Sequence, residues 1–301
     1  MQSFSFKAKS ELCRTPVQRL CCARAECYGV LLYCNTFTMQ EVRIITENQE
    51  FAARLPRLFQ RAFNVKFDRL PVDELPGGKL IFQITDAEKL RRIVDALGYD
   101  PRQSLVLHVN FALLEEDCCR IAFLRGAFLS GGSVTDPEKR YHLELSTSHV
   151  QASREVSALM QEMGFLPRSV MRGGSAVIYF KQSEHIEDIL TTLGAPVAAT
   201  EIMTAKVDKE IRNGANRAMN CDMANVNKTL DAVAAQQEAI GKLKETGRLE
   251  QLPDKIQQTA LLRLQNPELS LVQLAALFDP PISKSCLNHR IRKIMEEARK
   301  L

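Results

Sequence analysis

The sequence has no hydrophobic run that could cross a membrane. None of its apolar stretches approaches the roughly 20 residues that a bilayer-spanning helix needs. The first residues, Met1 to Ser10, also lack the apolar centre of a secretory signal peptide. We therefore expect a cytoplasmic protein with no membrane partner.

Cysteine pairs with the CxxC spacing of metal and redox sites are absent as well. The nine cysteines are an odd number, which does not fit a secreted disulfide framework, and they do not have the ligand spacing of a zinc site. We expect the cysteines to be reduced and mostly buried, and we expect no bound metal or other cofactor.

A large excess of charge is also missing. The 40 basic and 36 acidic residues leave a net charge of +4, which is weak evidence for a nucleic-acid partner. Basic residues are nevertheless concentrated in two segments: five lie between Phe6 and Arg24 against one acid, and six lie between Ser283 and Leu301 against two. Each segment alone is equally consistent with a solvated face and with phosphate contacts.

The composition is that of a globular protein. Hydrophobic residues make up 45% of the 301 residues and charged residues 25%, and the chain is long enough for two or three domains with their own cores.

The first two thirds of the chain contain a duplication. Aligning Gly29 with Gly126 superposes CCARAECYGVLLYCNTF on CCRIAFLRGAFLSGGSV at an offset of 97 residues, which also matches two pairs of adjacent cysteines. Each of these apolar helices is followed by a predicted strand, helix, strand and helix. The predicted elements are residues 41–46, 48–63, 78–85 and 86–98 in the first copy, and residues 141–147, 150–165, 175–182 and 183–194 in the second.

Helix-end signals recur in both copies. Asp86 and Ser183 are predicted N-caps, and Gly98 and Gly194 are predicted C′ glycines. These matched ends support the duplication.

A glycine in the middle of each opening helix predicts how the two copies pack. A glycine inside a helix costs about 1 kcal/mol, so it needs a compensating contact. If Gly29 and Gly126 face each other, the helices can meet backbone to backbone because no Cβ holds them apart.

The segment LRGAFLSGGSV, residues 124–134, resembles the LAGLIDADG motif of homing endonucleases. The resemblance implies a pseudo-two-fold saddle with the two motif helices at its centre and with sheets that lie on DNA. In that family each helix ends in an acidic residue that holds a divalent metal at the scissile phosphates. The matching residue types are Leu124, Gly126, Phe128, Gly132 and Ser133.

The acidic residues of that motif are missing here. The metal-binding acid falls on Gly131 in the second copy and on Cys34 in the first. The other acidic position falls on Leu129 and Leu32. Because Mg²⁺ needs hard oxygen ligands, we expect no catalytic residue and no nuclease activity. A coincidental packing of two small-residue helices is the alternative to the family resemblance.

After residue 196 the pattern changes to long helices. Residues 201–247 predict two or more helices that end at Gly247, with Asp222 as the N-cap of the last. The segment from Arg212 to Thr229 is rich in asparagine and basic residues, and asparagine is unfavourable inside helices. This segment is either a capped junction between helices or a surface that donates hydrogen bonds to phosphates or to the other domain.

The C-terminal residues predict a helix-turn-helix. Helices are expected over residues 254–267, 270–278 and 283–301, with Ser270 and Ser283 as N-caps. A stripe on the last helix must face the core, and it consists of Leu287, Ile291, Ile294 and Ala298.

The opposite side of the last helix carries the candidate DNA-binding residues. In a helix-turn-helix this helix lies in the major groove, where amide, hydroxyl and guanidinium groups contact base edges and phosphates. His289 could ligate a metal instead, but no second ligand is placed with it. The basic last turn could complement the helix dipole, which does not explain Asn288 and Arg292. The predicted DNA-binding residues are Lys284, Ser285, Asn288, His289, Arg292 and Lys293.

A degenerate LAGLIDADG duplication joined to a C-terminal helix-turn-helix resembles the WhiA family of bacterial sporulation and cell-division regulators. The most specific segments are Arg212 to Thr229 and Asp279 to Ile294. The resemblance implies a cytoplasmic transcription factor that is found with the nucleoid and lacks nuclease activity. It also implies that the helix-turn-helix makes the main DNA contacts and that the saddle is an accessory platform.

The expected fold is α+β, with a duplicated pseudo-two-fold LAGLIDADG-like saddle followed by an all-α helix-turn-helix domain. The expected parts are a basic N-terminal segment (1–16), the first repeat (17–98), an inter-repeat linker (99–116), the second repeat (117–196), a helical linker (197–250) and the helix-turn-helix domain (251–301).

Three functions remain open. The favoured one is a regulator of cell division, chromosome segregation or sporulation. It binds double-stranded promoter or operator DNA, with phosphate support from the basic N-terminus, alone or with another transcription regulator. The second is a nucleoid-associated scaffold that acts mainly through division or segregation proteins. The third is an enzyme, either a maturase-like RNA chaperone or a metal-dependent LAGLIDADG nuclease that uses Asp136 or Glu138 in place of the missing acids.

Overall fold

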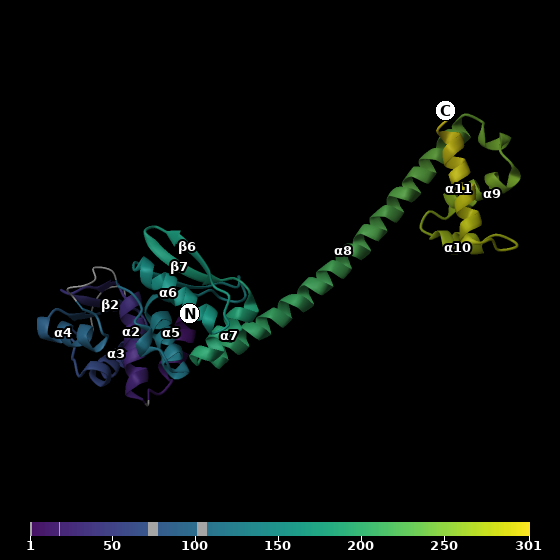
Figure 1. Ribbon diagram of the computed structural model, residues 1–301. Helices are drawn as coiled ribbons and strands as arrows, with labels where there is room; N and C mark the ends of the chain where they lie inside the picture. Colours follow the sequence, from purple (N-terminus) through teal and green to yellow (C-terminus); the bar gives the residue numbers. More distant parts are fainter. Residues whose placement is uncertain (1, 18, 72–77, 101–106) are drawn as a thin grey trace. The chain divides into compact units, whose positions relative to one another are not determined.

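The computed structural model of the chain describes residues 2–17, 19–71, 78–100 and 107–301. They form two compact units, of which unit 1 ends at Glu210 and unit 2 is Ile211–Leu301 (Figure 1). Within the described parts of the chain, no helix combines the length and the apolar character that a bilayer crossing requires.

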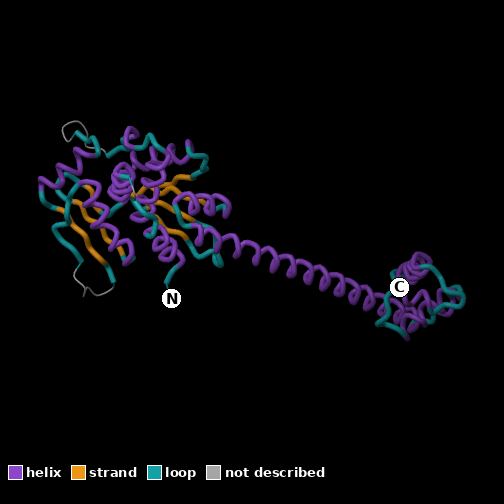
Figure 2. Tube along the Cα trace, turned by 90° about the horizontal axis from the view of Figure 1, so that it is seen from below, coloured by secondary structure: helices purple, strands orange, loops and turns teal. Residues whose placement is uncertain are grey.

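Unit 1 is built from two α/β halves whose opening helices pack together. These helices, α2 (Leu20–Tyr33) and α5 (Asp117–Gly131), make the most extensive contact between any two elements. Most of their residues are buried all round, as expected for helices at the centre of a core. Figure 2 shows the strands of unit 1 in two separate groups, one from each half.

The first half contains a three-stranded antiparallel sheet in the order β1-β2-β3. Strand β2 pairs with β3 over its whole length, from Val42 opposite Ile84 to Thr46 opposite Leu80. The elements of this half, besides α2, are β1 (Thr36–Phe37), β2 (Val42–Thr46), α3 (Gln49–Phe63), β3 (Leu80–Ile84) and α4 (Ala87–Ala96).

The second half repeats this order and adds a strand. Its sheet has the order β4-β5-β7-β6, and all pairs are antiparallel. A short 3-10 helix, Phe111–Leu113, precedes α5. The other elements are β4 (Gly132–Val134), β5 (Leu143–Thr147), α6 (Val150–Glu162), β6 (Arg168–Arg172), β7 (Ser175–Phe180) and α7 (Ser183–Leu193).

In the two repeats of unit 1, three of the four predicted helix caps are correct. The Asp86 side chain accepts a hydrogen bond from the backbone N–H of Lys89 at 2.9 Å. Gly98 and Gly194 have φ of +71° and +103°, the left-handed conformation that ends a helix. Ser183 is not an N-cap, because α7 already begins there, and its hydroxyl bonds to the carboxylate of Glu184 instead.

Several elements of unit 1 were not predicted, among them the short strand β1, the helix α1 and the strand β6. The basic N-terminal segment contains a helix, α1 (Phe4–Cys13), which is capped by the Ser3 hydroxyl and buries Phe4, Ala8 and Leu12. Strand β6 is exposed along its whole length, so it has no alternating pattern from which a strand could be predicted.

The predicted division of residues 201–247 into several helices is wrong. A single helix, α8, runs from Pro196 to Glu245, and Asp222 lies inside it rather than at a cap. The Asn- and Arg-rich segment is exposed except at Gly214, which is partly buried. Water can therefore hydrate the amide side chains, which would otherwise compete for the hydrogen bonds of the helix backbone.

Unit 2 is all-helical. A 3-10 turn, Leu249–Gln251, follows the end of α8, where Gly247 has a φ of +66°. The remaining helices are α9 (Asp254–Gln265), α10 (Leu271–Ala276) and α11 (Lys284–Ala298).

All nine cysteines are free thiols, but the prediction that most are buried is wrong. Three are buried (Cys27, Cys34 and Cys119), three are partly buried (Cys13, Cys22 and Cys118), and three are exposed (Cys21, Cys221 and Cys286).

Candidate nucleic-acid interface

The helices of the predicted helix-turn-helix begin where their caps place them. The Ser270 hydroxyl and the Gln273 side chain form a reciprocal capping box at the start of α10. The Ser283 hydroxyl accepts a hydrogen bond from the backbone N–H of Cys286 at 3.1 Å at the start of α11. Each cap satisfies backbone N–H groups that have no partner inside the helix.

The predicted apolar stripe of α11 faces the core of unit 2. Leu287, Ile291 and Ile294 are buried, and Ala298 is partly buried. Leu287 and Ile291 pack with Leu274, Ala275 and Phe278 from the α10 region. This packing fixes which face of α11 is left for solvent.

The free face of α11 presents the six predicted DNA-binding residues. Asn288 is partly buried, and the other five are exposed: Lys284, Ser285, His289, Arg292 and Lys293. Three positive charges, a hydroxyl, an amide and an imidazole therefore lie on one accessible helix face. Among the described residues, no cluster of three or more metal-ligating side chains includes His289.

Two arginines of unit 2 have structural roles that the sequence did not reveal. Arg263 on α9 is 2% exposed, and it donates to the Gln236 side chain at 2.9 Å and to the Leu269 carbonyl oxygen at 2.6 Å. It thereby ties α9 to α8 and to the turn before α10, and burial lowers its pKa. The Arg290 guanidinium lies over the Phe278 ring, 5.2 Å from its centroid.

In unit 1, α2 and α5 meet at the paired glycines. A Cβ added to Gly29 would overlap the Phe123 carbonyl oxygen, and a Cβ added to Gly126 would overlap the Glu26 carbonyl oxygen. The two backbones therefore touch directly, which only glycine permits at these positions.

A buried ionic network lies beside this contact. The Glu26 carboxylate, 0% exposed, accepts two hydrogen bonds from Arg54 at 2.6 and 2.9 Å and lies 3.5 Å from Arg125. Arg54 also donates to the carbonyl oxygens of Cys13 and Thr15. Burial opposes the charge on Arg54, but the hydrogen bonds and negative charge of Glu26 outweigh it and raise its pKa.

The two positions onto which the motif's metal-binding acids were expected to fall, Cys34 and Gly131, carry no oxygen ligand. Cys34 is buried, its thiol lies 3.1 Å from the Thr36 carbonyl oxygen, and burial raises its pKa to about 12. A Cβ at Gly131 would lie 2.5 Å from the Ser146 carbonyl oxygen and 2.9 Å from the Tyr33 ring. An acidic side chain could not enter position 131 without moving the backbone.

The possible replacement acids lie away from the helix ends. Asp136 and Glu138 are in the turn between β4 and β5, where the Asp136 carboxylate accepts the backbone N–H of Glu138 at 2.9 Å. Among the described residues, they belong to no group of three or more potential metal ligands.

The basic residues between Phe6 and Arg24 do not form a free arm. The Lys9 ammonium lies 5.9 Å from the Phe128 ring centroid, and burial lowers the pKa of Lys9 to about 8. Arg24 donates to the Ala62 carbonyl oxygen at 3.3 Å. The expected phosphate support from this segment therefore loses at least two of its cations to contacts within unit 1.

Known protein families match parts of both units. The family model of the WhiA LAGLIDADG-like domain matches residues 120–212, and that of the WhiA C-terminal HTH domain matches residues 215–298. The chain is 34% identical over 309 residues to "Probable cell division protein WhiA" of Ruminiclostridium cellulolyticum, which covers 99% of this chain and 98% of that protein. The chain belongs to the WhiA family.

Other WhiA proteins agree with this assignment. A relative with the same description from Alkaliphilus metalliredigens is 32% identical over 304 residues, covering 97% of this chain and 96% of its own. Full-length DUF199/WhiA from Thermotoga maritima is similar in fold, with a TM-score of 0.60, 22% identity, and coverage of 100% and 99% of the two chains. The N-terminal LAGLIDADG domain of DUF199/WhiA gives a TM-score of 0.51 at 17% identity, over 64% of this chain and 91% of that one. The predicted WhiA resemblance and the predicted α+β fold are confirmed.

The buried charges of this WhiA protein were not predicted from the sequence. Glu26 and Arg125 are the only charged residues in the apolar central parts of α2 and α5, and they are 99 residues apart. An isolated charge in the apolar part of a helix indicates a buried partner, so this signal could have marked each residue as a buried charge, although it does not say which partner the residue meets.

Proposed function

We propose that this chain is a sequence-specific DNA-binding regulator of transcription that acts in cell division, chromosome segregation or sporulation. It binds double-stranded promoter or operator DNA in the cytoplasm, at the nucleoid. The observation that carries the proposal is the free face of α11, where Lys284, Asn288 and Arg292 lie opposite a well-packed core stripe. The naming of the relatives as probable cell division proteins supports the biological role.

The chemistry of this face supports base recognition as well as charge attraction. An arginine can bond to O6 and N7 of guanine, and an asparagine to N6 and N7 of adenine, with two hydrogen bonds each. Lys284 and Lys293 flank these groups and can contact phosphates, which fix position without reading sequence. The face therefore offers both kinds of contact on a single helix.

We expect Arg292→Ala to weaken binding of a specific duplex by about 10- to 100-fold, because a bidentate base contact contributes about 1–3 kcal/mol. Gel-shift titration against a duplex that the wild-type chain enriches from a random pool measures this change. Arg292→Lys keeps the positive charge but loses the planar guanidinium that can donate two parallel hydrogen bonds to one base. This variant should lose most of its preference for the specific duplex while retaining nonspecific DNA binding.

Lys255→Ala is the matched control for this test. Lys255 is exposed on α9 in the same unit, outside the proposed interface, so its loss removes a charge without touching the α11 face. Equal affinities for wild type and Arg292→Ala, or equal losses in both alanine variants, would contradict the proposed interface.

We also propose that the chain does not cleave DNA. Supercoiled plasmid incubated with the chain and Mg²⁺ should stay uncut, because glycine and cysteine occupy the positions that would need carboxylates. Nicking by the wild type that disappears in Asp136→Asn would show that a nuclease site survives in the β4–β5 turn.

A scaffold acting through protein partners is the second candidate. It is favoured only by the naming of the relatives as cell division proteins, not by a particular surface of this chain. If isolated wild-type chain enriched no common sequence from the random pool, this candidate would replace the first.

A further inference from the structure

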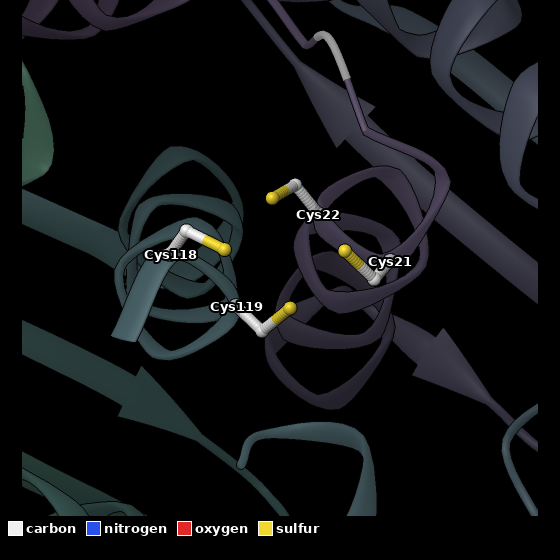
Figure 3. A group of neighbouring side chains, drawn as sticks. All are labelled: Cys21, Cys22, Cys118 and Cys119. Carbon is white, nitrogen blue, oxygen red and sulfur yellow. The ribbon is translucent and has the colours of Figure 1, made fainter. Parts of the chain in front are cut away.

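Four cysteines from the two halves of unit 1 come together in space. Cys21 and Cys22 lie in the first turn of α2, and Cys118 and Cys119 lie in the first turn of α5. Their four sulfur atoms all lie within 4.8 Å of one another. Figure 3 shows the two pairs on the neighbouring helix ends, with sulfurs directed toward the space between them.

The distances suit a single metal ion. A tetrahedral zinc ion with Zn–S bonds of about 2.3 Å holds its four sulfurs about 3.8 Å apart. The longest sulfur–sulfur distance in the group exceeds this spacing by at most about 1 Å. Small rotations of the cysteine side chains can remove that difference. An iron–sulfur cluster would require sulfurs bound to different irons and therefore more widely spaced.

The chemistry of the four ligands selects the ion. A set of four thiolates in a tetrahedron is typical of zinc or of iron–sulfur sites, and it is poorly matched to Mg²⁺ or Ca²⁺. With the cluster excluded by spacing, zinc is the fitting ion. We propose that Cys21, Cys22, Cys118 and Cys119 bind one zinc ion that joins the N-terminal ends of α2 and α5.

The surroundings favour negative charge at this point. A zinc ion with four thiolates carries a formal charge of −2, since two positive charges meet four negative ones. Two helix N-termini, each with unpaired backbone N–H groups and a partial positive charge, meet at the site. The Arg19 guanidinium adds a full positive charge and donates to the Cys118 sulfur at 3.8 Å.

Three of the four thiols are at least partly exposed to solvent, and Cys119 is buried. Cys21 is exposed and Cys22 and Cys118 are partly buried, so an ion can enter from solvent. Burial works to raise the pKa of Cys21, but hydrogen bonds with Cys119 and Cys22 outweigh it and lower that pKa. Burial and neighbouring thiols raise the pKa of Cys22 to about 11. Binding therefore releases the thiol protons, four at most, as the four Zn–S bonds form.

The zinc ion would give the α2–α5 pair a second fixed point. The glycine contact between Gly29 and Gly126 fixes the middle of the helix pair, and the zinc ion fixes its N-terminal end. No bound metal was expected from the sequence, because the cysteines of no single segment have the ligand spacing of a zinc site. The ligands of this site are shared between copies 97 residues apart.

Titration of the reduced full-length chain with Co²⁺ tests the proposal directly. We expect one equivalent to produce the strong visible absorption of tetrahedral thiolate coordination, and Zn²⁺ to displace it. The double variant Cys22→Ser/Cys119→Ser should lose this absorption. The single variant Cys21→Ser, at an exposed position, should weaken zinc binding at least about tenfold, since even changes in the residues around metal ligands cost 10- to 100-fold.

The matched control is Cys221→Ser/Cys286→Ser, which removes two exposed cysteines of unit 2 and should bind one equivalent as the wild type does. No absorption in the wild type, or the same absorption in Cys21→Ser, would overturn the proposal.

Thiol alkylation separates a zinc site from disulfides. In zinc-loaded chain, iodoacetamide should modify Cys221 and Cys286 and spare Cys21, Cys22 and Cys118, the accessible members of the cluster, until a chelator is added. If these three remain unmodified after chelation and become reactive only after reduction, they are held in disulfides and the zinc assignment is wrong.

Discussion

Gly126→Ala is expected to lower the free energy of unfolding of unit 1 by at least about 3 kcal/mol, at or beyond the upper end of typical overpacking costs. The added Cβ would overlap the Glu26 carbonyl oxygen and lie 3.0 Å from the Val30 nitrogen, so it meets backbone that cannot rotate away. The helices would have to separate along the most extensive contact of the unit. Gly29→Ala should have a similar effect, because its Cβ would overlap the Phe123 carbonyl oxygen.

Urea unfolding followed by circular dichroism measures this loss, and Gly214→Ala is the matched control. Gly214 lies in α8, where an added Cβ meets no atom within 4 Å. Replacing a helical glycine with alanine in open space should stabilise the helix by up to about 1 kcal/mol. If Gly126→Ala were as stable as Gly214→Ala, the backbone contact between α2 and α5 would be wrong.

Glu26→Gln is expected to lower the free energy of unfolding of unit 1 by about 3–5 kcal/mol, the usual cost of removing one partner from a buried ion pair. The carboxylate is 0% exposed and balances two guanidinium groups, those of Arg54 and Arg125. Glutamine fills the same volume but leaves both positive charges buried without a counter-charge.

The control for Glu26→Gln is Glu50→Gln in the same unit. Glu50 also pairs with an arginine, Arg14 at 3.5 Å, but both side chains are largely solvent-accessible. Solvent screens such a pair, so the same chemical change should alter stability by less than about 1 kcal/mol. Equal effects in the two variants would mean that the Glu26 network is solvated in solution.

Much of the fold could be predicted because local signals agreed with tertiary packing. Asp86, Ser270 and Ser283 are side-chain caps that act within three residues, so their helices start where the sequence places them. The duplication could be found because burial imposed the same apolar pattern on both copies. The pattern failed at β6, whose exposed residues pair only through the backbone with β7.

The candidate interface could be predicted for a similar reason. The stripe of Leu287, Ile291 and Ile294 repeats with the period of a helix, so the opposite face follows from geometry alone. Contacts between distant segments could not be predicted in this way. Glu26 meets Arg54 and Arg125 only because three helices converge, and no local pattern encodes that convergence.

The free face of α11 is proposed to recognise DNA sequence. Selection from a random duplex pool by the full-length wild type and by Asn288→Ala/Arg292→Ala tests it most directly, with urea unfolding as the check that both chains are equally stable. We predict that the wild type enriches one common sequence and that the variant enriches none, although it still binds DNA weakly through the remaining lysines. Enrichment of the same sequence by both chains would show that recognition lies elsewhere in the molecule.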